Sequence, residues 1–235
     1  MKTFYWYDYE TFGLKPHFQR IAQFAGIRTD EDLNILDEHM FYCKPTNDSL
    51  PSPEACSVTG ITPQLCEKKG LIEHEFIKKI NEEFSKPNTC IVGYNSIAFD
   101  DEFTRHTLFR NFLDPYAWHW KNGNTRWDIL KVVRFCYAHA KDNSLNWVID
   151  DNNKPIFKLD RLAQLMVLNT LTLTMQWLMS VQQSVLLKSL KIVNLGYLNM
   201  LLVCVIRMKL RNKLSLSLPF STPQVVILLN SPVLD

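Results

Sequence analysis

Aromatic and apolar residues dominate the first strand-length stretch of the chain, residues 3–13. The run Phe4-Tyr5-Trp6-Tyr7 is followed by Asp8, Glu10 and turn residues that end in Gly13, which predicts a buried strand running into a turn. Side chains two positions apart on a strand point to the same face. Asp8 and Glu10 are therefore expected to emerge side by side at the end of an apolar strand.

The alternation of apolar and polar segments predicts further elements as far as Leu162. Two strands, at residues 21–30 and 40–43, follow the first with short connections, which favours an antiparallel meander. An apolar run at residues 89–95 predicts a fully buried strand of the parallel kind. Helices are expected at residues 62–70, 72–84, 100–110 and 128–139, another begins within residues 157–162, and Pro51 and Pro53 mark a loop. This order indicates an α/β fold with one mixed sheet, in which the meander adjoins parallel strand–helix units.

Asp100 opens the helix that follows the predicted parallel strand. A strand–loop–helix unit brings the carboxyl end of the strand and the amino end of the helix to one rim, where open α/β sheets usually bind ligands. Asp100 can therefore meet Asp8 and Glu10 at that rim. The alternative is that Asp100, Asp101 and Glu102 only stabilise the amino end of the helix through its macrodipole.

Carboxylates grouped at the end of a buried strand repel one another unless a cation compensates for their charge. Mg²⁺ binds through one or two carboxylates together with the phosphate oxygens of a substrate. Asp8 and Glu10 are thus candidate metal ligands of a nuclease. Two acids that simply face solvent at a strand end would give the same pattern.

The stretch from Asn111 to Trp127 is rich in both aromatic and basic residues. Single-stranded nucleic acid is bound by aromatic faces that stack on bases and by cations that contact phosphates. Ordinary core packing is the alternative interpretation for some of these residues. The aromatic members are Phe112, Tyr116, Trp118, Trp120 and Trp127, and the basic ones are Arg110, Lys121 and Arg126.

The length of 235 residues suits one domain, or one and a half. A formal charge of +2 is too small to indicate nucleic-acid binding, so any basic surface must be local. The six cysteines form no C-x-x-C pair and no zinc spacing, and no secretory signal opens the chain, so we expect reduced thiols in a cytoplasmic protein. Neither the first aromatic run nor the apolar segment at residues 195–206 is long enough to cross a membrane.

Several separated motifs resemble those of one family and occur in the same order. Asp8-x-Glu10 and the later Gly93-Tyr94-Asn95-x-x-x-Phe99-Asp100 resemble the first two motifs of the DEDD three-prime exonucleases, which have an RNase H-like fold. The resemblance is narrowed to the bacterial exodeoxyribonuclease I family, which degrades single-stranded DNA from its 3′ end, and it covers about residues 4–164. The narrowing motifs are Tyr7-Asp8-Tyr9-Glu10-Thr11-Phe12-Gly13, Thr59-Gly60-Ile61-Thr62-Pro63-Gln64, Phe99-Asp100-Asp101-Glu102, Arg110-Asn111-Phe112-x-Asp114-Pro115-Tyr116 and Arg126-Trp127-Asp128.

The resemblance implies hydrolysis assisted by two Mg²⁺ ions, which Asp8, Glu10, Asp100 and one later Asp would hold. A His would act as the general base. The resemblance further implies a cytoplasmic monomer that acts in DNA repair, with single-stranded DNA and a single-stranded DNA-binding protein as partners. Residues that match DNA-contacting positions of the family are Arg105, Tyr116, Trp120, Arg134 and Lys158.

The last family motif is missing after Gln164. The family pattern carries the general-base His and the last metal-binding Asp in a segment that reads roughly Ala-His-Asp-Ala-Met-Ala-Asp-Val. This chain instead reads Leu173-Thr174-Met175-Gln176-Trp177-Leu178-Met179-Ser180, has no His after His139, and has no Asp between Asp160 and Asp235. The chain thus offers three of the four metal carboxylates and no general base.

A slip of the reading frame by one nucleotide near Gln164 explains the loss. The segment from Leu173 to Ser180 back-translates as CTC ACG ATG CAA TGG CTG ATG TCN, and the same bases with a preceding G read GCT CAC GAT GCA ATG GCT GAT GTC. The second reading encodes Ala-His-Asp-Ala-Met-Ala-Asp-Val. We expect residues 1–164 to form an exonuclease domain without its last motif and residues 165–235 to be an out-of-frame tail without a native domain. A divergent hydrophobic tail is the alternative, and the sequence leaves open whether a slip is genomic or a reading error.

The function expected from sequence is Mg²⁺-dependent 3′ to 5′ hydrolysis of single-stranded DNA by family, with little or no activity in this chain. One alternative is a non-catalytic remnant that binds single-stranded nucleic acid. Another is a related exonuclease that acts on RNA.

Overall fold

A computed structural model describes residues 2–139, 147–159 and 161–162. The chain divides into two compact units, Met1–Asp128 and Ile129–Asp235. Residues 165–235, which the sequence predicts to be an out-of-frame tail, lie outside the described residues. The proposed boundary near residue 164 therefore stays a prediction.

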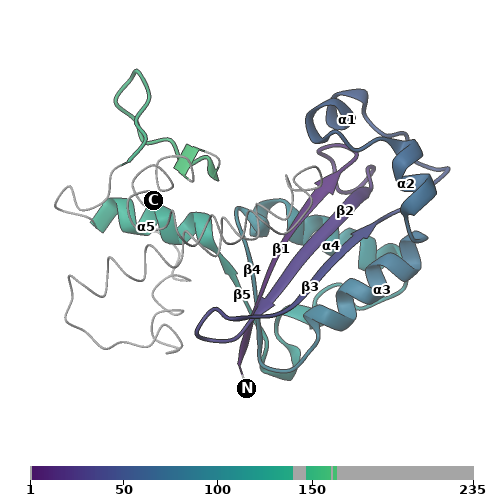
Figure 1. The fold of residues 1–235 in the computed structure, drawn as a ribbon, viewed down its shortest axis with the longest axis horizontal. Coiled ribbons are helices and arrows are strands. Elements are labelled where there is room, and N and C mark those ends of the chain that lie inside the picture. The colour runs from purple at the N-terminus through teal and green to yellow at the C-terminus, as the bar shows by residue number, and fades with distance from the viewer. Residues whose placement is uncertain (1, 140–146, 160, 163–235) are drawn as a thin grey trace, which may run out of the picture. The chain divides into compact units, whose positions relative to one another are not determined.

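The first unit is built on a five-stranded mixed sheet with the order β3-β2-β1-β4-β5 (Figure 1). β1 pairs antiparallel with β2, and β2 pairs antiparallel with β3, which is the predicted meander. β4 runs parallel to β1 and to β5. The predicted α/β class with a mixed sheet is confirmed, and β1 is the central strand that joins its two halves. The strands are β1 (Thr3–Thr11), β2 (Ile21–Thr29), β3 (Ile35–Tyr42), β4 (Thr89–Gly93) and β5 (Thr125–Asp128).

Five α-helices are described, and four of them follow the sequence pattern. Thr62 caps the second helix as predicted, because its hydroxyl accepts a hydrogen bond from the amide of Leu65 at 3.2 Å and Pro63 is the first helical residue. None of these helices combines the length and the apolar character that a membrane span requires. The helices are α1 (Pro53–Thr59), α2 (Pro63–Lys69), α3 (Glu73–Phe84), α4 (Asp100–Arg110) and α5 (Ile129–His139).

Three elements differ from the sequence prediction. β3 begins at Ile35, five residues before the predicted start at residue 40, because residues 35–39 also pair with β2. Pro53 begins α1 instead of marking a loop, because proline is tolerated in the first turn of a helix and the hydroxyl of Ser52 caps the amide of Ala55 at 3.3 Å. β5 lies within a stretch that the sequence showed only as aromatic and polar. Its four residues form a strand because β4 offers a parallel partner, with Ile91 opposite Arg126 and Val92 opposite Trp127.

The main core lies on the face of the sheet that α3 and α4 cover (Figure 1). Tyr5, Tyr7 and Tyr9 alternate along β1 and are all buried in this cluster. α3 contributes the positions predicted from its helical spacing: Phe76, Ile77, Ile80 and Phe84. Because alternate strand residues face opposite sides, Asp8 and Glu10 lie on the other face of β1 from the three tyrosines.

The second unit is described through α5 and residues 147–159 and 161–162. Tyr137, Trp147 and Phe157 meet there edge to face, with ring centroids 5.3 to 6.1 Å apart. Such pairs contribute about 0.5–1.5 kcal/mol beyond the burial of area. A helix was predicted within residues 157–162, and helical residues begin at Leu159.

Phe84 is the residue whose truncation tests this core most directly. Its ring is fully buried and lies 4.9 to 6.0 Å from the rings of Tyr5, Tyr7, Phe24 and Trp118. We expect Phe84→Ala to lower the free energy of unfolding by about 3–5 kcal/mol, the usual cost of removing a buried phenylalanine. Phe109→Ala is the matched control, because Phe109 is 71% exposed on α4 and should change the free energy by less than about 0.5 kcal/mol. Urea unfolding of the two variants measures the difference, and equal midpoints would contradict this description of the core.

Candidate active site

Two tyrosine hydroxyls fasten the end of β1 to the first turns of α4. Tyr7 donates a hydrogen bond to Oδ1 of Asp101 at 2.6 Å, and the hydroxyls of Tyr9 and Thr104 lie 2.9 Å apart. All four side chains are buried. Because side chains alternate between the two faces of β1, Asp8 and Glu10 lie together on the face opposite Tyr7 and Tyr9, as their i and i+2 spacing predicted.

The turn between β4 and α4 directs Asp100 toward β1. Gly93 ends β4 at a point where a Cβ atom would lie 2.5 Å from Cβ of Ser96, so a larger residue would force this turn apart. Asn95 then adopts a left-handed conformation with φ of 58°, and its amide donates to Oδ1 of Asp128 at 2.8 Å. α4 begins five residues later with Asp100, which is 5% exposed. The predicted strand–loop–helix unit and its rim are both present.

Asp8, Glu10 and Asp100 interact electrostatically. Burial and the neighbouring charge of Glu10 raise the pKa of Asp8 to about 8. Burial and the charges of Asp8 and Asp101 raise the pKa of Asp100 well above its usual value. Backbone hydrogen bonding at Tyr9 lowers the pKa of Asp8 and of Asp100, but the effect of burial is larger. The structure therefore brings together the three carboxylates that the sequence selected.

Asp101 is a residue of this site that the sequence reasoning left without a role of its own. Its side chain is 1% exposed, and both of its oxygens are engaged, Oδ1 by Tyr7 and Oδ2 by Arg126 at 2.6 Å. Arg126 comes from β5, so Asp101 links β1, α4 and β5. Its charge also raises the pKa of Asp100. The sequence signal that could have revealed this link is the acid Asp101, directly after the candidate ligand Asp100, together with the basic residue Arg126 in the stretch that forms β5.

Three of the predicted DNA-contact residues lie in the first unit. The guanidinium of Arg105 lies 5.3 Å from the ring centroid of Tyr116 and pairs with Glu102. Asp114 holds the backbone around Tyr116 by accepting hydrogen bonds from the amides of Tyr116 and Ala117. Tyr116 is 55% exposed and Trp120 is 59% exposed, so both rings are available for stacking. Trp118, in contrast, is fully buried and donates from Nε1 to the carbonyl of Pro115, as the alternative of core packing had allowed.

The other two predicted contact residues, Arg134 and Lys158, belong to the second unit. The guanidinium of Arg134 lies 6.0 Å from the ring centroid of Phe157 on an exposed face of α5. Lys158 is exposed next to Phe157. In the second unit, Arg134 and Phe157 thus form a cation–aromatic pair like that of Arg105 and Tyr116 in the first unit. The positions expected to carry the last motif lie outside the described residues.

Comparison with known proteins identifies the family of this site. The family model described as exonuclease (RNase_T) matches residues 5–155, which include all three clustered carboxylates. The chain belongs to this exonuclease family.

Curated relatives narrow the assignment within the exonuclease family. Over 163 residues, the chain is 58% identical to exodeoxyribonuclease I of Haemophilus influenzae, 52% to that of Buchnera aphidicola from Schizaphis graminum and 50% to that of Escherichia coli. These matches cover 69% of this chain and 34% of each relative, so the chain spans about a third of their length. The motifs predicted a resemblance over about residues 4–164, and the matches have nearly the same length. The predicted resemblance to exodeoxyribonuclease I is confirmed.

Solved structures agree with the exonuclease fold. The structure of E. coli exonuclease I in complex with a dT13 oligonucleotide has a TM-score of 0.77 at 37% identity, and the match covers 92% of this chain and 43% of that chain. The complex of exonuclease I with SSB-Ct has a TM-score of 0.67 at 48% identity, and it covers 70% of this chain and 36% of that chain. The RNase H-like exonuclease fold predicted from the motifs is confirmed.

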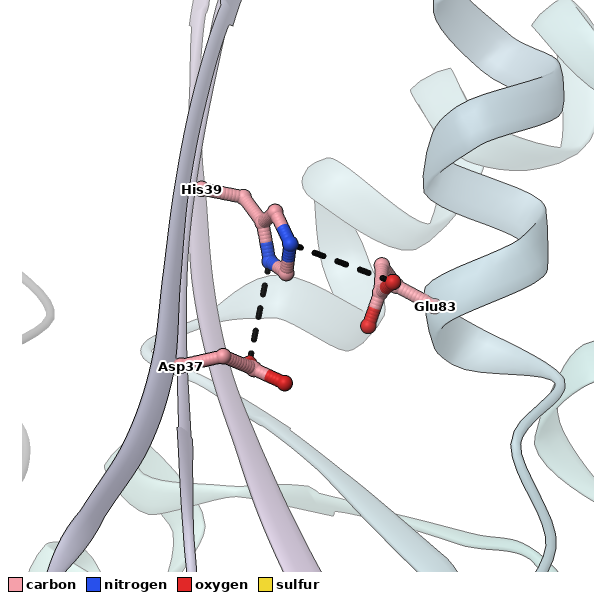
Figure 2. Close-up of side chains that lie close together, drawn as sticks. All are labelled: Asp37, His39 and Glu83. Carbon is pink, nitrogen blue, oxygen red and sulfur yellow. Dashed lines mark ion pairs between the residues drawn. The ribbon is translucent and has the colours of Figure 1, made fainter.

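A second group of possible metal ligands lies in this exonuclease unit, beside the start of β1. Figure 2 shows Asp37 and His39 of β3 with Glu83 of α3; the imidazole lies 3.7 Å from Asp37 and 3.9 Å from Glu83. Arg28 contacts Glu83 at 3.0 Å and Asp37 at 3.4 Å, and Lys86 contacts Glu83 at 2.6 Å. Two cations therefore already balance the two carboxylates. This group is an ion-pair network that joins β2, β3 and α3, and a metal ion would have to displace Arg28 or Lys86.

The raised pKa of Asp8 leads to a prediction about stability. A carboxyl whose pKa rises from about 4 in the unfolded chain to about 8 in the folded protein binds more protons when folded. Its ionisation therefore destabilises the metal-free exonuclease as the pH rises through this interval. Asp8→Asn removes the ionisation, so the stability of the variant relative to the parent should increase by about 3–4 kcal/mol between pH 5 and pH 8, at about 1.4 kcal/mol per pH unit.

Urea unfolding in the presence of a chelator measures this difference at both pH values. Asp32→Asn is the matched control, because Asp32 is exposed and far from the carboxylates along the chain. Mg²⁺ should then stabilise the parent more than Asp8→Asn. The same difference in stability between variant and parent at both pH values would contradict the destabilising effect of ionised Asp8.

Proposed function

We propose that this chain carries the catalytic acids of a Mg²⁺-dependent exodeoxyribonuclease that degrades single-stranded DNA in the 3′ to 5′ direction. The observation that carries the proposal is the convergence of Asp8, Glu10 and Asp100 on the end of β1. Membership of the exonuclease family indicates a hydrolytic nuclease that depends on divalent metal. The assignment of Mg²⁺ and of these three residues as its ligands is our inference.

The donor set fits Mg²⁺, which binds carboxylate oxygens together with substrate phosphate. The raised pKa values of Asp8 and Asp100 mark charges that burial leaves undercompensated, and a divalent cation would supply the compensation. Bound there, the metal would lower the pKa of water and neutralise charge on the phosphate. Within the chain, Asp101 is held by Tyr7 and Arg126 and maintains the position of the first turn of α4.

Single-stranded DNA is the substrate that the exposed side chains favour. Tyr116 and Trp120 offer stacking surfaces, and Arg105 beside Tyr116 offers a cation for phosphate. One similar structure is E. coli exonuclease I in complex with a dT13 oligonucleotide, and another is an ExoI/SSB-Ct complex. By this likeness we infer single-stranded DNA and a single-stranded DNA-binding protein as partners of this chain. A cytoplasmic monomer with a role in DNA repair belongs to the same proposal.

The proposal includes weak or absent activity for this polypeptide. The sequence after Gln164 lacks both the Asp that would complete the metal site and the His that would accept a proton from water. Loss of a general base alone costs about 10²–10⁴ in rate. Three carboxylates can still hold metal, but proton transfer at the attacking water is left to solvent.

End-labelled single-stranded DNA with Mg²⁺ measures the activity. We expect nucleotide release to be at least about 10²-fold slower than for an exodeoxyribonuclease I with all four motifs, because proton transfer is unassisted. Asp8→Asn should abolish the residual nucleotide release. This result would show that the release comes from this chain and not from a contaminating nuclease. Release at the full rate would overturn the predicted impairment, and a preference for single-stranded RNA of the same sequence would favour the RNA exonuclease alternative.

The alternative of a non-catalytic binding remnant is supported by the same exposed aromatics. It predicts binding of single-stranded DNA that weakens as salt increases, without cleavage. Trp120→Ala should weaken binding by about 1–3 kcal/mol, the value of one stacked base, whereas Phe109→Ala should leave affinity unchanged. Fluorescence anisotropy of a labelled oligonucleotide in a chelator measures both variants. Equal affinities would exclude Trp120 as a stacking surface.

A further inference from the structure

Two histidines from distant parts of the sequence meet beside α4. The ring centroids of His17 and His106 are 4.1 Å apart, and the rings are inclined at 69°. His17 lies in the connection between β1 and β2 and is exposed, whereas His106 lies on α4 and is partly buried. The edge of one imidazole therefore faces the other at a point that solvent reaches.

The loop that carries His17 is held in place against α4. The carbonyl of Pro16 accepts a hydrogen bond from Arg110 at 3.4 Å. Gln19 closes the loop on itself, because its amide donates to the carbonyl of Lys15 at 2.8 Å and its side-chain oxygen accepts from the amide of Lys15 at 2.8 Å. The approach of His17 to His106 is thus built into the backbone, which lowers the entropic cost of using both rings together.

The charges around the histidine pair permit a cation. Glu102 lies one helical turn before His106, on the same face of α4. Arg110 and Arg105 are also close, but each already pairs with a carboxylate, Arg110 with Glu73 at 2.8 Å and Arg105 with Glu102. Burial and the charge of His17 lower the pKa of His106, so its imidazole is neutral at neutral pH and has a lone pair available.

We propose that His17 and His106 form a binding site for Zn²⁺ or a similar first-row transition metal ion. Neutral imidazole nitrogens are preferred ligands of zinc, copper and nickel, whereas magnesium prefers oxygen. Water completes the coordination. The site is separate from the carboxylates at the end of β1 in both ligand chemistry and residues. A bound ion ties the β1–β2 loop to α4.

Isothermal titration of the full chain with Zn²⁺ in excess Mg²⁺ tests this site, because Mg²⁺ occupies oxygen ligands and leaves imidazoles free. We expect one Zn²⁺ to bind with Mg²⁺ present, and His17→Gln and His106→Gln each to weaken binding at least about tenfold. His74→Gln is the matched control, because His74 is a histidine exposed on α3. His39→Gln tests the ion-pair network and should also leave Zn²⁺ affinity unchanged.

A second measurement keeps the result independent of variant folding. Imidazole nitrogen resonances in long-range ¹H–¹⁵N spectra should shift on addition of Zn²⁺ for His17 and His106 and remain in place for His74. Loss of Zn²⁺ binding in His39→Gln, equal affinities in all four variants, or unshifted His17 and His106 rings would each overturn the proposal. None of these outcomes depends on nuclease activity.

Discussion

The parallel pairing of β1 with β4 is the constraint on which the site depends. Thr3 to Trp6 lie opposite Thr89 to Val92, so both strands run toward the same edge of the sheet. The chain leaves β4 at that edge, turns at Asn95 and starts α4 with Asp100. In this way an acid more than 90 residues distant reaches Asp8. Antiparallel pairing of these strands would have put Asp100 at the opposite end of β1.

This convergence places like charges together in a partly buried site, and the surrounding side chains limit the energetic cost. Tyr7 and Arg126 satisfy both oxygens of Asp101, so the deepest acid of the group is fully paired. For Asp8 and Asp100, burial and neighbouring carboxylates outweigh the backbone hydrogen bonding that favours their ionised forms, and their pKa values rise. A buried acid with a strongly raised pKa beside other acids is typical of a functional site. Without a bound cation, ionisation of these acids lowers the stability of the folded protein.

The two proposed metal sites differ in their donor atoms. The carboxylates at the end of β1 present only oxygen, which suits a hard divalent ion that also binds phosphate. The pair of His17 and His106 presents nitrogen, which suits a softer ion. The network of Asp37, His39 and Glu83 mixes both, yet Arg28 and Lys86 already neutralise it. The acids of this network are neutralised by basic side chains, whereas Asp8 and Asp100 have raised pKa values. This difference in charge balance distinguishes the ion-pair network from the candidate metal site.

The sequence by itself determined β1 and its two acids, the meander, the positions of α2, α3 and α4, and the family, because period-two and helical spacing and ordered motifs are local signals. The same signals misassigned Pro53 and missed β5, since a proline suits either a loop or a first helical turn and a short strand forms only when a partner is present. Only the tertiary structure decided which aromatic residues are core and which are exposed. Trp118 and Trp120 stand two positions apart, yet the first is fully buried and the second is 59% exposed. Only the tertiary structure shows two further sets of contacts: those of Asp101 with Tyr7 and Arg126, and that of His17 with His106. These contacts join segments distant in sequence, whose proximity depends on how the sheet and α4 pack.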